Sequence, residues 1–295
     1  MRPLRFGLAG TGYWARIAHA AALASTEGVE FAAVWGRDQA AAGKLAGSHG
    51  ATAYQDFDEF IAAVDAVAFA VPPQVQAALA QRAARAGKHL LLEKPIAASV
   101  ADANALARAV DDAGVATVVF FTALFQPDLR AWLADAAARG GWLGGTAVWL
   151  GTALQPGNPF NTPWRRQKGG LWDLAPHLIA LLLTSLGPAE VAAASRGPAD
   201  VSHLVLRHLG GASSALTVTL SAPPAAEYLE VFLWGATGRS AAPREGGDAV
   251  TPLRVALAEL AGNVSSGQRR HRCDVHFGRD VVALVADAER LMSGG

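Results

Sequence analysis

Residues 4–15 read LRFGLAGTGYWA, and this stretch decides the fold of the first half of the chain. An apolar run is followed at once by the glycine-rich GTGYWA, and then by an alanine-rich segment of helical character. In that setting Gly10 allows a tight turn, Gly12 lets the backbone approach a pyrophosphate, and Ala15 is small enough for helix-on-strand packing. The helix N-terminus adds amide donors and positive partial charge. The stretch therefore predicts a dinucleotide-binding turn, with three further candidate contacts: Thr11, Tyr13 and Trp14.

Apolar runs alternate with helix-like segments from this turn to residue 121. Such alternation is typical of a parallel sheet that helices cover on both faces. We therefore expect an α/β fold, a doubly wound Rossmann domain over residues 1–121. Its carboxyl edge should bind the ligand, and Val71 and Pro72, at the end of the third run, are candidate contacts there. The later strand-like runs lie at 31–35, 66–71, 89–92 and 115–121, and the helix-like segments at 39–49, 54–63, 75–86 and 99–113.

The end of the second strand bears on the choice of dinucleotide. In NAD sites an Asp or Glu near this position accepts a hydrogen bond from the ribose 2′-hydroxyl. This chain has Gly36 at the expected position, followed by Arg37 and Asp38. A guanidinium can pair with a 2′-phosphate, and a missing carboxylate removes repulsion toward it. We expect NADP to be preferred, with Gly36 and Arg37 among its contacts, while Asp38 keeps NAD as the alternative.

The composition excludes several other classes of protein. The 295 residues suit two domains at about 150 residues each. A hydrophobic fraction of 52% with only 17% charged residues argues against disorder. The 25 basic and 25 acidic residues balance, so nothing points to nucleic acid. The single cysteine, Cys273, fits a reducing compartment, no apolar run reaches membrane-spanning length, and the histidines show no metal-ligand spacing. We expect a cytoplasmic protein without a metal site.

Four motifs occur in a characteristic order along the chain. The glycine-rich turn comes first, then Pro72-Pro73, then AGKH at 86–89 leading into EKP at 93–95, and finally GGLWDLAPH at 169–177. In this combination the chain resembles the Gfo/Idh/MocA oxidoreductases. The resemblance runs over nearly the whole chain. It implies an enzyme that binds NAD or NADP and acts on a small molecule.

The resemblance also implies a second, α+β domain with a large, mostly antiparallel sheet. We expect it over residues 122–295, with a last helix near 279–292 that packs back on the first domain. The family often buries one face of this sheet in a dimer, so we expect a homodimer or homotetramer through the C-terminal sheet. The sequence agrees, because strand-like segments lie at 142–153, 190–195, 201–208, 212–221 and 228–234.

Lys94 is the leading catalytic candidate. It follows the fourth strand of the first domain, where open α/β sheets bind their ligands, and Pro95 restricts the backbone beside it. Partial burial would depress the pKa of Lys94, which would let it exchange a proton with a hydroxyl or carbonyl group. Glu93 could orient Lys94 or contact the nicotinamide ribose, and we count it with the cofactor-binding residues.

Asp173 and His177 are the catalytic candidates of the second half. They are four residues apart, so on one helix they would share a face. Pro176 conflicts with a helix interior, so a helix could instead begin near it. The family resemblance assigns the matching positions to substrate binding and proton transfer, and an imidazole can act as acid or base near neutral pH.

Aromatic residues and an arginine are candidates for contact with the substrate. The set consists of Trp164, Arg165, Trp172 and Phe125. Three positions depart from the family pattern, because Gln76 replaces a frequent histidine, Ala180 replaces a frequent acid, and 121–127 lacks the usual polar residues. These departures favour a deoxysugar, or a less polar ketone or imine, over an ordinary polyhydroxylated sugar.

Together these features predict hydride transfer between a nicotinamide and a small hydroxyl- or carbonyl-bearing substrate. Lys94 would exchange the proton, His177 would assist, and Asp173 would orient the substrate or His177. One alternative is a glycosidase of the same superfamily that uses NAD only transiently. Another is a cofactor-binding regulator without turnover.

Overall fold

The computed structural model describes residues 2–243 and 248–294. The chain divides into two compact units. Unit 1 comprises Met1–Phe125 with Gly247–Asp280, and unit 2 comprises Gln126–Gly246 with Val281–Gly295. The expected domains were 1–121 and 122–295, with a last helix near 279–292 packing back on the first. In the structure a late segment also belongs to unit 1. That segment contains α9 (Val250–Ser265) and the first turns of α10 (Val275–Ser293). The rest of α10 belongs to unit 2.

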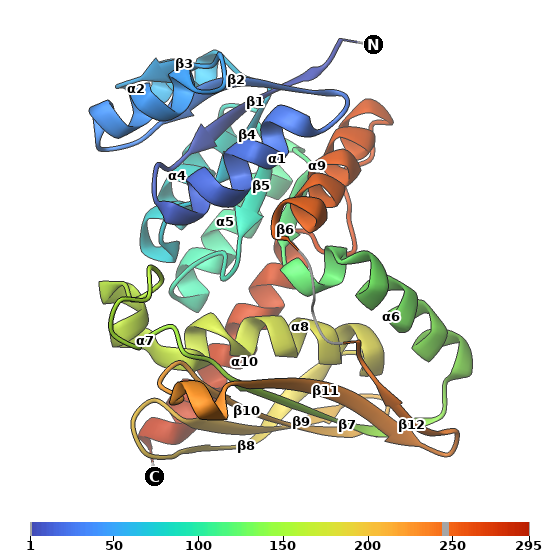
Figure 1. The fold of residues 1–295 in the computed structure, drawn as a ribbon. Coiled ribbons are helices and arrows are strands. Elements are labelled where there is room, and N and C mark those ends of the chain that lie inside the picture. Colours follow the sequence, from blue (N-terminus) through green and yellow to red (C-terminus); the bar gives the residue numbers. More distant parts are fainter. Residues whose placement is uncertain (1, 244–247, 295) are drawn as a thin grey trace. The chain divides into compact units, whose positions relative to one another are not determined.

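Unit 1 is built on a parallel sheet of six strands in the order β3-β2-β1-β4-β5-β6 (Figure 1). This is the order of a doubly wound dinucleotide-binding sheet, and it reverses between β1 and β4. The strands are β1 (Leu4–Ala9), β2 (Val29–Trp35), β3 (Thr52–Tyr54), β4 (Ala66–Phe69), β5 (His89–Glu93) and β6 (Thr117–Phe120). β4 and β6 are buried at every position, as strands covered on both faces must be.

Helices cover the two faces of this sheet. Right-handed connections carry the chain outward in opposite directions from the β1–β4 reversal, so α1 and α4 lie on opposite faces. α1 packs beside α9, and α4 packs beside α5. The helical elements are η1 (a π-helix, Ala15–His19), α1 (Ala20–Ser25), α2 (Gln39–Gly47), α3 (Phe57–Ala62), α4 (Pro73–Arg85), α5 (Val100–Ala113) and the 3-10 turn η2 (Thr122–Phe125).

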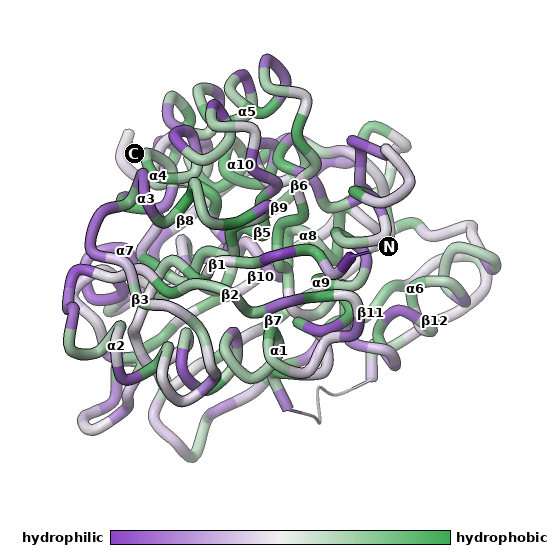
Figure 2. The backbone as a smooth tube through the Cα atoms, turned by 90° about the horizontal axis from the view of Figure 1, so that it is seen from above, coloured by the Kyte–Doolittle hydropathy of each residue, from purple (hydrophilic) through white to green (hydrophobic). Residues whose placement is uncertain are grey.

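Local signals explain where these helices begin and end. Side chains of Asp38, Asp56 and Ser99 accept hydrogen bonds from the first backbone N–H groups of α2, α3 and α5. Gly114 ends α5 in the left-handed conformation, at φ 61°. Figure 2 shows hydrophobic residues running through β5 and β6, whereas hydrophilic residues lie mainly in loops and on outer helix faces.

Unit 2 is built on a mixed sheet in the order β12-β11-β7-β10-β9-β8 (Figure 1). Only β7 and β10 pair in parallel, so the sheet is mostly antiparallel, as expected. The strands are β7 (Trp142–Leu150), β8 (Ala189–Arg196), β9 (Ser202–His208), β10 (Ser213–Thr219), β11 (Tyr228–Gly235) and β12 (Gly238–Ala241). The helical elements are α6 (Pro127–Arg139), α7 (Pro163–Asp173), α8 (Ala175–Leu186) and the 3-10 turn η3 (Pro224–Ala226).

One face of this second sheet is buried within unit 2. Burial alternates strictly along β9, and α8 packs on β7 and β10. The continuous stretch Pro163–Leu186 is apolar and long enough to pass for a membrane span, but 78% of its apolar window is buried inside the fold. It therefore has the character of a core helix pair.

Candidate functional site

The glycine-rich turn has the geometry that its sequence predicted. Gly10 has φ +135°, and a Cβ there would stand 2.4 Å from the carbonyl oxygen of Ala70. Its N–H donates to the carbonyl of Trp35, which ties the turn to the end of β2. At Gly12, by contrast, a Cβ would meet no atom within 4 Å. The turn therefore leaves open space beside Gly12, where the backbone can approach a pyrophosphate.

Residues around this turn fit a dinucleotide. A Cβ at Gly10 would lie 3.3 Å from the side chain of Val71, so the turn after β4 adjoins it, while the neighbouring Pro72 is exposed. Arg16 donates to the carbonyl oxygen of Thr11 at 2.9 Å. The helix that follows presents amide groups that have no partner within the helix, which is what an anion requires.

At the end of β2, Gly36 stands where NAD sites usually carry an Asp or Glu. A Cβ on Gly36 would stand 2.6 Å from the methyl carbon of Thr11, so a larger residue here would require the Thr11 side chain to move. The carboxylate of Asp38 accepts a hydrogen bond from the N–H of Ala41 and caps α2. Arg37 is exposed. The one acid near this position is thus engaged by a helix terminus.

Glu93 joins the end of β5 to the helix after the glycine-rich turn. One carboxylate oxygen, Oε1, accepts a hydrogen bond from Nε1 of Trp14 at 2.7 Å and lies 2.8 Å from Nε2 of His19. His19 is fully buried and comes from η1. Because this contact pairs the imidazole with a carboxylate, the natural arrangement has Nε2–H donating to Glu93. Sequence reasoning did not select His19; the alanine-rich surroundings suggested only a packed helix.

Lys94 follows Glu93 directly and is half-buried. The peptide bond between Lys94 and Pro95 is cis. The side chain of Gln76, which is fully buried, contacts the backbone on both sides of Lys94. Gln76 therefore faces the main chain, and its presence carries no information about how polar a substrate is. This position therefore does not support the expected preference for a less polar substrate, which stays a prediction.

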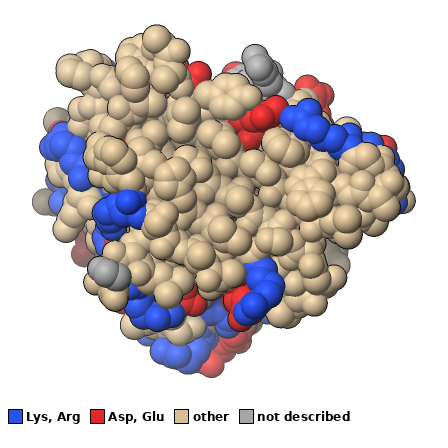
Figure 3. Space-filling view, turned by 90° about the horizontal axis from the view of Figure 1, so that it is seen from below, with Lys and Arg blue, Asp and Glu red and all other residues tan. Residues whose placement is uncertain are grey.

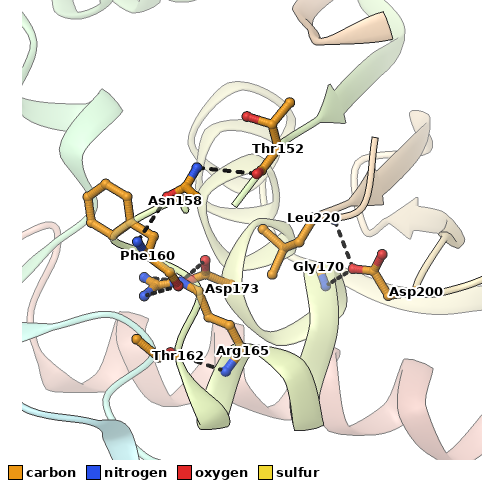
Figure 4. A network of polar contacts seen from close by, with 9 residues as sticks. All are labelled: Thr152, Asn158, Phe160, Thr162, Arg165, Gly170, Asp173, Asp200 and Leu220. Carbon is orange, nitrogen blue, oxygen red and sulfur yellow. Dashed lines mark hydrogen bonds and ion pairs between the residues drawn. The ribbon is translucent and has the colours of Figure 1, made fainter. Parts of the chain in front are cut away.

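In unit 2, Asp173 is held by an arginine. The guanidinium of Arg165 donates through Nε to Oδ2 at 2.6 Å and through Nη2 to Oδ1 at 3.3 Å (Figure 4). The side chain of Asp173 is 7% exposed and that of Arg165 22%. The guanidinium also lies over the rings of Phe160 and Trp164. This bidentate pair balances the charge of Asp173 and orients it.

His177 does not share one continuous helix with Asp173. α7 ends at Asp173 and α8 begins at Ala175, with Pro176 in its first turn. A helix therefore begins near Pro176, as one alternative had it. The backbone of Leu174 between the two helices is right-handed helical, and a shared face of Asp173 and His177 stays a prediction. His177 is 9% exposed, and its ring lies 5.5 Å from that of Trp149.

Asp200, which sequence reasoning missed, fixes the glycine pair that precedes Asp173. Its Oδ2 accepts hydrogen bonds from the N–H of Gly170 and of Leu220, both at 2.8 Å (Figure 4). Its Oδ1 accepts a hydrogen bond from the hydroxyl of Thr219 at 2.6 Å. Burial raises the pKa of Asp200, but these hydrogen bonds, with one from Ser221, outweigh it and hold the pKa below 3.8. Gly169, at φ 63°, bends α7 here.

Two of the candidate substrate residues are part of the core. Phe125 is fully buried in unit 1, stacked on His271 with ring centroids 6.1 Å apart and beneath Arg272. Trp172 is 1% exposed, with Lys168 over its ring. Among the described residues, the buried indole N–H groups of Trp172 and Trp164 have no hydrogen-bond partner. The parts of the chain that the structure describes contain no cluster of His, Cys, Asp or Glu suited to a metal ion.

Comparisons with known proteins agree with this geometry. Residues 4–121 match the Gfo/Idh/MocA family model, described as an oxidoreductase family with an NAD-binding Rossmann fold. Inositol 2-dehydrogenase of Rhizobium meliloti (strain 1021) is 30% identical over 189 residues, covering 64% of this chain and 56% of that protein. The chain spans little more than half the length of the first three curated relatives that it matches, between 54% and 56%.

Solved structures show the same fold over the whole chain. GenD2 from gentamicin A biosynthesis, in complex with NAD, has a TM-score of 0.87 at 21% identity, covering 100% of this chain and 95% of that one. Levoglucosan dehydrogenase in complex with NADH and levoglucosan has a TM-score of 0.85 at 19% identity, covering 99% and 98%. At such identities the likeness concerns the fold alone. Residues 4–121 of this chain thus form an NAD-binding Rossmann unit of the Gfo/Idh/MocA oxidoreductase family.

Proposed function

We propose that the protein is an NAD(P)-dependent oxidoreductase that acts on a small hydroxyl- or carbonyl-bearing molecule. One observation carries the proposal. The hydrogen bond from Trp14 to Glu93 joins the glycine-rich turn to the residue before Lys94, so a dinucleotide on that turn has an amine close to its binding edge. Relatives named for inositol and levoglucosan support a substrate of the sugar or polyol class, although a deoxysugar, ketone or imine belongs to the same chemistry.

The proposed mechanism assigns proton transfer to this chain's own side chains. When bound, the nicotinamide supplies or accepts the hydride. Nζ of Lys94 takes a proton from the substrate hydroxyl, or donates one to the carbonyl oxygen, as hydride leaves or arrives. His177 assists as a second proton carrier, and Asp173, whose charge Arg165 balances, orients the substrate. Trp164 and Arg165 stay candidates for substrate contact. Among the described residues, the indole N–H of Trp164 has no hydrogen-bond acceptor, so it could donate to a substrate.

Removing the amine tests this mechanism. Lys94→Ala should lower turnover by about 10²–10⁴-fold, because general acid–base catalysis usually contributes that much. The binding of NADPH should stay unchanged. Turnover is measured by the absorbance of reduced nicotinamide across a panel of polyols, deoxysugars, ketones and imines. The matched control is Lys44→Ala, because Lys44 is exposed on α2. Undiminished turnover in Lys94→Ala would contradict the role of Lys94 in proton transfer.

Two other outcomes would favour the alternative functions. Glycoside cleavage without net absorbance change would indicate a glycosidase that uses its cofactor transiently, and cofactor binding without any activity would indicate a regulator.

We propose NADP as the preferred cofactor, with NAD as the alternative. Gly36 puts no acid at this position and packs against the side chain of Thr11, Asp38 is engaged as a helix cap, and Arg37 is exposed at the same turn. Arg37→Ala should raise the Kd for NADPH about tenfold or more while leaving the Kd for NADH within about twofold. Equal losses for both cofactors in a fluorescence titration would contradict the preference.

We also propose a homo-oligomer that forms through the outer face of the unit 2 sheet. Figure 3 shows a broad face of the molecule with few charged side chains, and large apolar residues of this sheet are exposed: Val205, Tyr228 and Trp234. Light scattering should give a dimer or tetramer for the native chain and a monomer for Val205→Glu. A monomeric native chain would contradict the proposed oligomer.

We propose a cytoplasmic location as well, which the single buried Cys273 supports.

A further inference from the structure

Gln76 forms an unusual set of hydrogen bonds for a buried glutamine. Its Oε1 accepts from the N–H of Glu93 at 2.9 Å. Its Nε2 lies 2.8 Å from the carbonyl oxygen of Glu93 and 3.3 Å from those of Pro95 and Ile96. The oxygen and the nitrogen of this amide group thus both form hydrogen bonds with one short backbone segment. That segment is centred on Lys94.

The sheet does not hold this segment. The pairing of β5 with β6 ends at Glu93, which lies opposite Phe120. Pro95 has no N–H to offer a neighbouring strand. Beyond Glu93 the backbone would therefore have carbonyl groups facing the interior without partners, and such groups are costly when buried. Gln76 supplies donors where the sheet supplies none.

The rest of the turn is fixed as well. Trp14 and His19 hold the carboxylate of Glu93, and Pro95 and Ile96 are buried. Gln76 itself sits in the first full turn of α4, where its N–H donates to the carbonyl of Pro72. The backbone on each side of Lys94 is therefore anchored to a helix.

We propose that Gln76 is a positioning residue for Lys94. By holding the backbone on both sides of Lys94 it sets the direction in which the amine leaves the turn. The inference rests on the proposed function insofar as that function gives Lys94 its task. The position of the amine can nevertheless be observed without any substrate.

The test uses the small number of lysines in the chain, which are Lys44, Lys88, Lys94 and Lys168. Reductive methylation with ¹³C-formaldehyde labels these amines and the N-terminus, and loss of one NMR signal in Lys94→Arg identifies Lys94. Gln76→Glu keeps an acceptor for Glu93 but loses the donors to the three carbonyl groups. It should shift the Lys94 signal while leaving the other lysine signals in place. Gln74→Glu is the matched control, because Gln74 is exposed on the same helix.

A second variant covers the case in which Gln76→Glu fails to fold. Gln76→His keeps one donor and one acceptor, and should move the Lys94 signal in the same direction by less. Turnover should fall about tenfold to hundredfold in the folded variant, with the Kd for NADPH little changed, because a small misplacement of a catalytic group is costly. An unmoved Lys94 signal in a folded Gln76 variant overturns the inference. If the Lys94 signal moves in a Gln76 variant but Lys94→Ala keeps full turnover, the positioning role of Gln76 stands and only the proposed function is overturned.

Discussion

Asp200 offers the sharpest test of how unit 2 holds its candidate residues. Two changes separate its charge from its hydrogen bonds. In Asp200→Asn, the remaining oxygen can still accept from Gly170 and Leu220, and the hydroxyl of Thr219 can rotate to accept from the new amide. The free energy of unfolding should fall by about 1–2 kcal/mol, since hydrogen bonds to a charged group are stronger than neutral ones.

Asp200→Ala should cost more. It leaves the buried N–H groups of Gly170 and Leu220 without their acceptor, and each such group costs about 1–3 kcal/mol. We therefore expect a loss of about 3–5 kcal/mol. Urea titrations followed by tryptophan fluorescence suit this unit, because six of the eight tryptophans lie in it: Trp132, Trp142, Trp149, Trp164, Trp172 and Trp234.

The effect of Asp200 should also depend on pH in a defined direction. The pKa of the folded-state carboxyl lies below its ordinary value of 3.8, because hydrogen bonds outweigh burial. Its contribution is therefore complete above about pH 5 and is lost as the pH falls through the folded-state pKa. The difference in the free energy of unfolding between the native chain and Asp200→Asn should become smaller below pH 4. The control is Asp287→Asn, an exposed carboxyl on α10, which should change stability by less than about 0.5 kcal/mol. Equal stability of Asp200→Asn and the native chain at pH 7 would refute the reasoning.

Two further perturbations test the other contacts. Arg165→Ala removes the guanidinium that pairs with the buried carboxylate of Asp173. It should lower the free energy of unfolding by about 3 kcal/mol, the low end for a buried pair because Arg165 keeps some exposure. Arg166→Ala, an exposed neighbour, should change it by under about 1 kcal/mol, and equal losses would contradict the role of the pair. Trp14→Phe removes the donor to Glu93 and should raise the Kd for NADPH about tenfold in a fluorescence titration; an unchanged Kd would contradict the coupling.

The sequence predicted well what depends on local pattern. Apolar runs and the glycine-rich turn identified most of the parallel sheet, because strands buried on both faces leave a continuous apolar signal. Short or peripheral elements escaped. β3 has only three residues, two of them exposed, and the expected helix-like segment 54–63 overlaps only its last residue. α6 and α9 carry a helical pattern, but they lie outside the motifs from which the second half was interpreted.

Residues whose importance depends on long-range contacts could not be identified in advance. Asp200 lies in a loop that resembles an ordinary turn, yet it contacts segments 30 residues before it and 19–20 residues after it. His19 meets Glu93 across 74 residues. Gln76 was recognised as a departure from the family pattern, but only the structure shows that its side chain faces the backbone of the turn. A motif reports which residues are present, whereas their partners are set by how strands are ordered in the sheet.

Strand order also explains why Glu93 connects the two parts of the nucleotide-binding edge. The order reverses between β1 and β4, so the turn after β1 and the end of β5 flank the same crevice, with β4 between them. A residue from each side can meet only if one reaches across the end of β4, and Trp14 and His19 do so from the helix after the glycine-rich turn. A dinucleotide that rests on this helix therefore binds to a segment already joined to the residue before Lys94. Under the proposed function, cofactor binding and proton transfer depend on the same carboxylate. Glu93→Gln should then impair cofactor affinity and turnover together, while Lys94→Ala should impair turnover alone.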